Sequence, residues 1–147
     1  PTATPTEFGA VSSDRQLMIA ADSETSETTS LMGMVGVKLP GSGMSVASLS
    51  GTYLFHELYI DNGTHGTTRF RVTFNGDGTG SYQELASSAG GLNPPGTFSY
   101  SVNANGTVSM GGLPGAVIAD GSVVLFLDHD YANPGGNPAS VKIGIKQ

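Results

Sequence analysis

Apolar and polar residues alternate with a period of two along most of this chain. The clearest run places Thr68, Phe70, Val72 and Phe74 on one face and Arg69, Arg71 and Thr73 on the other. Phe98, Tyr100 and Val102 alternate with Ser99 and Ser101, and Val141, Ile143 and Ile145 alternate with Lys142, Gly144 and Lys146. Because successive side chains of a strand point to opposite faces, each run predicts a strand whose apolar set faces a core.

Tight-turn dipeptides separate these runs. Asn-Gly begins at residues 62, 75 and 105, and Asp-Gly begins at residues 77 and 120. These pairs tolerate positive φ angles and are typical of hairpin turns. Strands are expected at 17–21, 34–38, 46–49, 52–60, 68–75, 81–85, 97–103, 107–110, 116–119, 122–128 and 141–146. The sequence therefore predicts an all-β protein, either an antiparallel up-and-down β-barrel or a barrel-like sandwich of short strands.

The start of the chain resembles its end. Residues 9–22 match residues 115–128 at an offset of 106, with identical Gly-Ala-Val, turn Asp14/Asp120 and closing Asp22/Asp128. After a slip of two residues, 35–38 match 143–146. This indicates an internal repeat, although strand–turn–strand segments in general share such patterns.

The repeat predicts a division of the chain. Its parts are a Pro/Thr leader (1–7), a partial repeat (8–38), a linker (39–50) and a complete repeat (51–147), packed as one compact domain. We expect residues 8–38 to pair with strands of the complete copy or of another subunit.

Composition narrows the setting. Charged residues make up 12% of the 147, the formal net charge is −6, and there are 22 glycines and no cysteine. The acidic balance argues against nucleic acid or an anionic membrane as partner, and no apolar stretch is long enough for a spanning helix. A Gly-rich, cysteine-free chain with few lysines favours a bacterial extracellular or cell-surface protein. The start at Pro1, without an initiator Met or signal peptide, suggests a processed protein or an excised fragment.

Few residues suggest chemistry. His56 and Glu57 are adjacent and would point to opposite faces of a strand, so without a bulge they cannot both ligate one metal ion. Asp128 and Asp130, which flank His129 at a strand end, are the candidate metal ligands, with Ca²⁺ as the ion. Asp22 stands at the place of Asp128 in the partial repeat, which favours a structural role for that residue. No catalytic residue or other cofactor site is expected, and nothing singles out Glu57 and Glu84 as paired carboxylates.

Two resemblances bear on function. Residues 47–53, which open a unit, and 142–146, which close one, resemble tandem β-rich repeats of bacterial secreted proteins of uncharacterised function. Gly51-Thr52-Tyr53 resembles the Gly-x-Trp that begins the first strand of lipocalin and avidin-like barrels, with Tyr53 in place of Trp. The second resemblance implies a ligand held inside a barrel.

We therefore expect a non-enzymatic structural, assembly or adhesion module whose partners are copies of itself or neighbouring repeats. The alternative is a barrel that binds a small apolar ligand or a partner protein, and the third possibility is a hydrolase. An empty apolar cavity would favour the alternative, whereas a barrel interior filled by Phe70, Phe74, Phe98 and Tyr100 would exclude it.

Overall fold

The structure, a computed structural model, describes residues 6–23, 31–61, 64–128 and 139–147. The chain divides into two compact units, Pro1–Lys38 and Leu39–Gln147. Apart from one short 3-10 helix, the regular structure of the described residues is β-strand, so the all-β prediction is confirmed. No helix of the described chain is long and apolar enough to cross a membrane.

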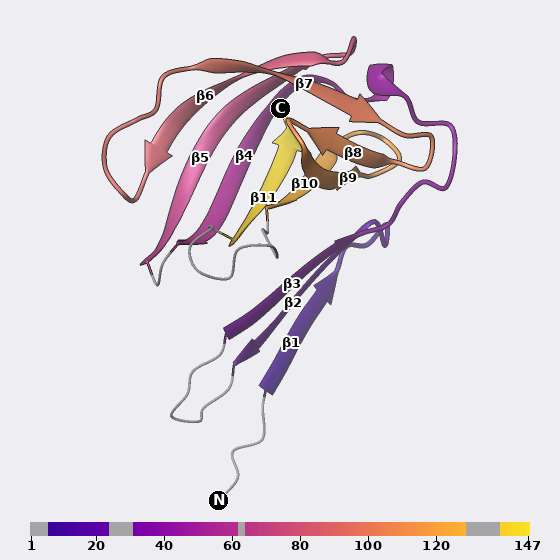
Figure 1. The fold of residues 1–147 in the computed structure, drawn as a ribbon. Coiled ribbons are helices and arrows are strands. Elements are labelled where there is room, and N and C mark those ends of the chain that lie inside the picture. The colour runs from indigo at the N-terminus through magenta and orange to yellow at the C-terminus, as the bar shows by residue number, and fades with distance from the viewer. Residues whose placement is uncertain (1–5, 24–30, 62–63, 129–138) are drawn as a thin grey trace, which may run out of the picture. The chain divides into compact units, whose positions relative to one another are not determined.

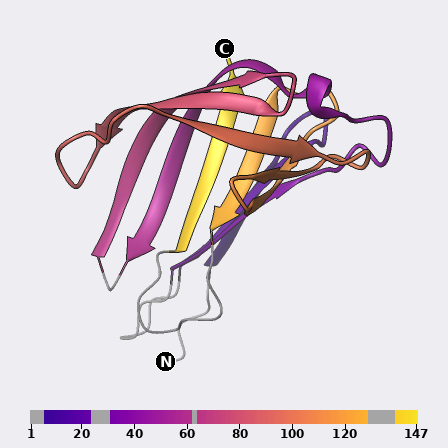
Figure 2. The ribbon, with the colours of Figure 1, turned by 45° about the horizontal axis from the view of Figure 1, so that its top comes forward.

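The second unit is a closed antiparallel barrel of eight strands (Figures 1 and 2). The strands are β4 (Ser50–Asp61), β5 (Thr64–Asn75), β6 (Thr79–Ser87), β7 (Gly96–Val102), β8 (Thr107–Met110), β9 (Leu113–Val117), β10 (Val123–Asp128) and β11 (Ala139–Lys146). Each strand pairs with the next one along the chain, and β11 pairs with β4 to close the ring. Of the two predicted architectures, the up-and-down barrel is therefore the correct one.

The pairing of β11 with β4 is the closing seam of the barrel. It runs from Ala139↔Ile60 to Lys146↔Tyr53, and the N–H of Gln147 donates to the carbonyl of Thr52 at 2.9 Å. Figure 1 shows the two strands side by side although they lie at opposite ends of the unit's sequence. Because the pair is antiparallel, the start of β4 and the end of β11 lie at the same end of the barrel.

Aromatic side chains fill that end, which is called the closed end here. Tyr53, Phe55, Phe74, Tyr100 and Phe126 are each at most 6% exposed. The rings of Tyr53 and Tyr100 meet Phe74 edge-to-face at 5.3 and 5.0 Å, and Phe55 stacks on Phe126 at 6.0 Å. Such ring pairs add to the hydrophobic burial that stabilises a thin core.

The segment before β4 belongs to this core. The 3-10 helix η1 (Val46–Ser48) is followed by Leu49, which is fully buried. The hydroxyl of Tyr100 donates to the carbonyl of Leu49 at 2.7 Å and accepts from the N–H of Gly76 at 2.9 Å. Residues 46–50, assigned above to a linker and a strand, thus form a short helix, a core residue and the start of β4.

The predicted faces are correct on β5 and β7 but reversed on β11. There Lys142 and Gly144 face inward, while Ile145 is 54% exposed. Gly144 is buried because the ring of Phe55 occupies the space of its missing side chain, and a Cβ would lie 2.3 Å from that ring. Alternation alone misassigns this strand, since its inward face carries small and charged residues.

The first unit is a three-stranded antiparallel sheet of β1 (Thr6–Val11), β2 (Leu17–Ser23) and β3 (Leu31–Val37), in the order β1-β2-β3. The strands of residues 8–38 thus pair with one another in this chain, and β1 begins inside the predicted leader. Pairing of this segment with another subunit stays a prediction.

The first unit repeats the backbone pairing of β9–β10–β11. Its pairs Val11↔Met18, Gly9↔Ala20, Met18↔Gly36 and Ala20↔Met34 correspond to Val117↔Val124, Gly115↔Phe126, Val124↔Gly144 and Phe126↔Lys142. The offsets are those of the sequence match, 106 for β1 and β2 and 108 for β3.

The turns correspond as well. Ser12 N–H donates to Leu17 at 2.9 Å, as Ile118 N–H donates to Val123 at 3.1 Å. The side chain of Asp14 accepts from the N–H of Gln16, as that of Asp120 accepts from Ser122. Arg15 has φ +59°, and Gly121, at the equivalent position, has φ +71°.

A candidate ligand cavity in the barrel

The aromatic cluster fills only the closed end of the barrel. Beyond it lies a cavity of about 590 Å³, called the barrel cavity here. Ligand pockets in proteins commonly measure about 300–1,000 Å³. The cavity is lined from seven of the eight strands and from the β6–β7 and β8–β9 connections. Its lining residues are Phe55, Glu57, Phe70, Val72, Tyr82, Glu84, Asn93, Pro94, Phe98, Met110, Gly111, Leu113 and Lys142.

Four aromatic rings belong to the apolar wall. Phe55 and Phe70 are paired across β4 and β5, and Tyr82 meets Phe70 edge-to-face with ring centroids 6.4 Å apart. Phe98 lies against Phe74 at 5.4 Å and so joins the wall to the closed-end cluster. In the sequence analysis, a barrel interior filled by Phe70, Phe74, Phe98 and Tyr100 would have excluded a ligand. In the structure Phe74 and Tyr100 belong to the packed cluster, whereas Phe70 and Phe98 line the cavity.

A buried carboxylate interrupts this wall. Glu84, on β6, is 4% exposed, and its Oε2 accepts hydrogen bonds from the N–H and the side-chain amide of Asn93, at 3.3 and 2.7 Å. A β-bulge lies beside it, because the register between β5 and β6 passes from Arg69↔Ala86 to Phe70↔Glu84 and skips Leu85. Bulges re-aim side chains. This one places Glu84 opposite the inward-facing Phe70.

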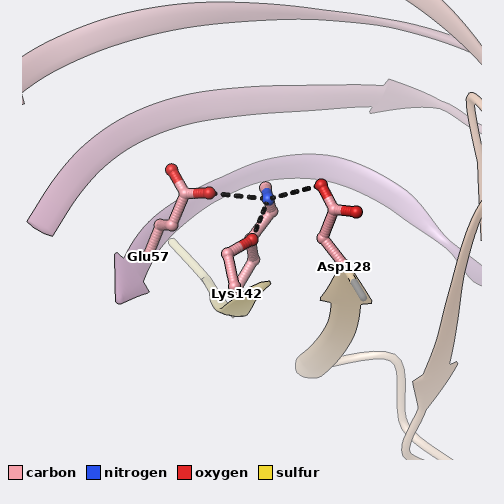
Figure 3. A network of polar contacts seen from close by, with 4 residues as sticks. Glu57, Asp128 and Lys142 are labelled. Carbon is pink, nitrogen blue, oxygen red and sulfur yellow. Dashed lines mark hydrogen bonds and ion pairs between the residues drawn. The ribbon is translucent and has the colours of Figure 1, made fainter. Parts of the chain in front are cut away.

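An ion-pair network forms a second polar group. The ammonium of Lys142 on β11 lies 2.7 Å from Oε1 of Glu57 on β4 and 3.9 Å from Oδ2 of Asp128 on β10 (Figure 3). Lys142 also donates a hydrogen bond to the hydroxyl of Ser140. The side chains of Lys142 and Glu57 are 15% and 13% exposed, so water screens this pair less than a surface pair.

The candidate metal ligands are only partly placed. Asp128 lies beside the ammonium of Lys142, which would repel a cation at that position. Asp130 and His129 lie outside the described residues. No group of three or more His, Asp or Glu side chains among the described residues has the arrangement of a metal site. A Ca²⁺ site at Asp128 and Asp130 stays a prediction.

The structure brings together residues that the sequence did not link. Glu57, Glu84 and Lys142 lie on three strands and line one cavity. Only the closed topology makes them neighbours, and no spacing in the sequence could have identified them. His56, next to Glu57, is exposed, as the alternation of a strand requires.

Comparison with known proteins adds no family: no family model matches the chain, and no curated protein matches its sequence.

Proposed function

We propose that this protein binds, in the barrel cavity, a small molecule with an apolar, ring-containing body and a cationic head group. The observation that carries the proposal is the cavity itself, which remains open in a barrel of only eight strands. An eight-stranded barrel is just wide enough to be filled by its own side chains or to hold one small ligand. The likeness of Gly51-Thr52-Tyr53 to lipocalin and avidin-like barrels supports the same function.

The head group follows from the formal charges. Glu57 and Glu84 contribute two carboxylates to the lining and Lys142 one ammonium, which leaves −1 at pH 7. Asp128 beside Lys142 adds a further negative charge. Inside an apolar cavity such a charge is weakly screened, so it favours an ammonium over a neutral or anionic group.

Three naphthalene compounds that share a ring and differ in head group test this proposal. We expect 1-naphthylmethylamine to bind with a Kd on the order of 10–100 µM. 1-Naphthalenemethanol should bind more weakly and 1-naphthoic acid weakest. Titration of the naphthalene fluorescence at pH 7 measures all three, and the chain contains no tryptophan.

Glu84→Gln tests whether Glu84 is the carboxylate that binds the ammonium group. The substitution should weaken binding of the amine by about tenfold, the worth of one charge-assisted hydrogen bond. The Kd of the alcohol should change by no more than about twofold. The control is Asp14→Asn, which removes the same charge from an exposed turn of the first unit and should change neither affinity. Absence of saturable binding, or tighter binding of the acid than of the amine, would contradict the proposal.

A different observation favours a second function, assembly. We propose that residues 6–38 and the barrel's last three strands are copies of one repeat, within a bacterial extracellular protein that assembles with copies of itself. The support is the shared register, turn hydrogen bonds and positive-φ position of the two segments. Size-exclusion chromatography with light scattering, from about 1 to 100 µM protein, should show concentration-dependent oligomers. A monomer throughout would contradict assembly.

A further inference from the structure

We propose that β1–β3 is a second closing segment for the barrel, which pairs with β4–β8 of a second copy of this chain in the place that β9–β11 occupies. The inference rests on the assembly proposal and names its interface. β4–β8 is called the five-strand block here.

The first support is the position of the sheet edges. In the barrel, β9 pairs with β8, and β11 pairs with β4. β1 and β3, which correspond to β9 and β11, are the two edges of the three-stranded sheet, and neither pairs with a further strand of the described chain. The edges of β1–β3 therefore match, in order and direction, the two edges that a five-strand block presents.

The second support is the apolar face. In β9 and β10, Val117 and Val124 point into the barrel core and are fully buried. Their counterparts Val11 and Met18 are 60% and 39% exposed. The face that would cover a five-strand block is thus present in β1–β3 and uncovered.

The third support is a glycine. Gly144 lies against the ring of Phe55 on the neighbouring strand β4, where a Cβ would approach that ring to 2.3 Å. Gly36 stands at the equivalent position of β3. Within its own sheet, a Cβ at Gly36 would meet only the side chain of Met18, at 3.4 Å. The space kept free at Gly36 fits the ring of Phe55 from a five-strand block.

Two differences favour β9–β11 as the closing segment. Lys142 pairs with Glu57, whereas β3 has Met34 at the equivalent position. Phe126 stacks on Phe55, whereas β2 has Ala20 at the equivalent position. Closure by β1–β3 would leave that volume empty, and cavities in a packed core destabilise it. β9–β11 therefore closes the barrel within a single chain. The exchanged form, in which β1–β3 of another copy closes the barrel, is the minor state.

Filling the missing volume should shift this balance. We expect Ala20→Phe in the full chain to raise the oligomer fraction at 100 µM at least about fivefold by light scattering. The matched control is Ile19→Phe, which adds the same ring to the opposite, already exposed face of β2 and should leave the fraction unchanged. An unchanged Ala20→Phe protein, or an equal effect of both variants, would overturn the proposal.

Cysteine pairs in trans identify the contact, because the chain has no cysteine of its own. Ile143 pairs with His56 across the closing seam, and Val35 is the counterpart of Ile143. In the Ala20→Phe background, a Val35→Cys protein mixed with a His56→Cys protein should form a mixed disulfide under diamide, assigned by peptide mass. Arg71→Cys, exposed on β5, replaces His56→Cys as the control and should give at most about a tenth of that yield.

Gly36→Ala should reduce the trans crosslink at least about fivefold, since its Cβ would meet Phe55 of the second copy. Oligomers without the Val35–His56 crosslink would overturn this interface but leave assembly standing. A protein that stays monomeric in light scattering and forms no trans crosslink would overturn both this interface and the assembly proposal. A Val35→Cys/His56→Cys double variant that links only within one chain would show that the second copy is not the partner.

Discussion

At the scale of single residues, the tyrosines of the closed end couple the fold to pH. Burial raises the pKa of Tyr53 to about 12 from its usual 10, and the nearby Tyr100 and Asp120 act in the same direction. Its hydroxyl donates to the carbonyl of Gly121, so the folded state prefers the protonated phenol. A folded pKa above the unfolded one gives a stability contribution that is complete below pH 10 and is lost as the pH rises towards 12.

We therefore expect the free energy of unfolding to fall by about 2–3 kcal/mol between pH 10 and pH 12. Tyr53→Phe should cost about 1 kcal/mol at pH 7 through the lost hydrogen bond and should flatten the alkaline fall. Urea unfolding at pH 8, 10 and 11.5 measures both effects. A variant that keeps the wild-type alkaline slope would contradict the assignment to Tyr53.

Lys142 forms an ion pair with Glu57, and both side chains are mostly buried. Lys142→Met should lower the free energy of unfolding at pH 7 by about 1–3 kcal/mol, because it leaves the mostly buried carboxylate without its cation. Lys146→Met, on an exposed residue of the same strand, should change it by less than about 0.5 kcal/mol. Equal effects in urea unfolding would show that the ion pair adds nothing.

The sequence predicted the direction of side chains correctly where apolar residues point into the barrel and polar residues point outward. Phe70, Val72 and Phe74 were correctly placed inward because arginine and threonine alternate with them. Lys142 was misplaced because a lysine inside a barrel has a meaning only when its partner Glu57, on a strand far away in the sequence, is known. For the same reason, the sequence did not decide whether the barrel interior is filled or contains a cavity.

At the scale of elements, two equivalent turns differ in how well their residues suit them. Arg15 holds φ +59° where the barrel's turn has Gly121. A left-handed backbone costs an L-residue about 1–2 kcal/mol. Glycine avoids this cost but loses more conformational entropy on folding, so the net gain from a substitution to glycine is smaller. Arg15→Gly should stabilise the β1–β2 hairpin by about 0.5–1 kcal/mol, measured by amide exchange of its residues.

The reverse change at the second turn provides the contrast. Gly121→Ala should destabilise the barrel by about 2 kcal/mol or more, since its Cβ would lie 2.6 Å from the carbonyl oxygen of Ser48. Unchanged exchange in Arg15→Gly would mean that the turn bears no strain.

Most strands were predictable because tight turns separate them. β1 (Thr6–Val11) was not among the expected strands, because its first residues, Thr6 and Glu7, continue a Pro/Thr segment. The expected strand at 46–49 is a 3-10 helix (Val46–Ser48) followed by the core residue Leu49, since four residues with apolar Val46 and Leu49 fit either structure. Tertiary packing at the closed end decided between them.

At the scale of the whole molecule, the two units should differ in stability. The first has three strands and exposes Val11, Met18, Ile19 and Met34. The barrel has eight strands and a buried aromatic cluster. Sheets of few strands with an uncovered apolar face open easily.

In hydrogen exchange at about 1 µM protein, amides of β1–β3 should therefore exchange on the order of 10³ times faster than those of β4 and β5. Comparable protection of the two units would contradict this expectation.

The closing seam has a mechanical consequence. Tension applied between the start of β4 and the end of β11 would pull two antiparallel strands apart from one end, along the direction of their hydrogen bonds rather than along the strands. The bonds would then break one after another, beginning with the bond from Gln147 to Thr52, as a zipper opens. Such a barrel would yield at low force, extend, and close again when the tension is released.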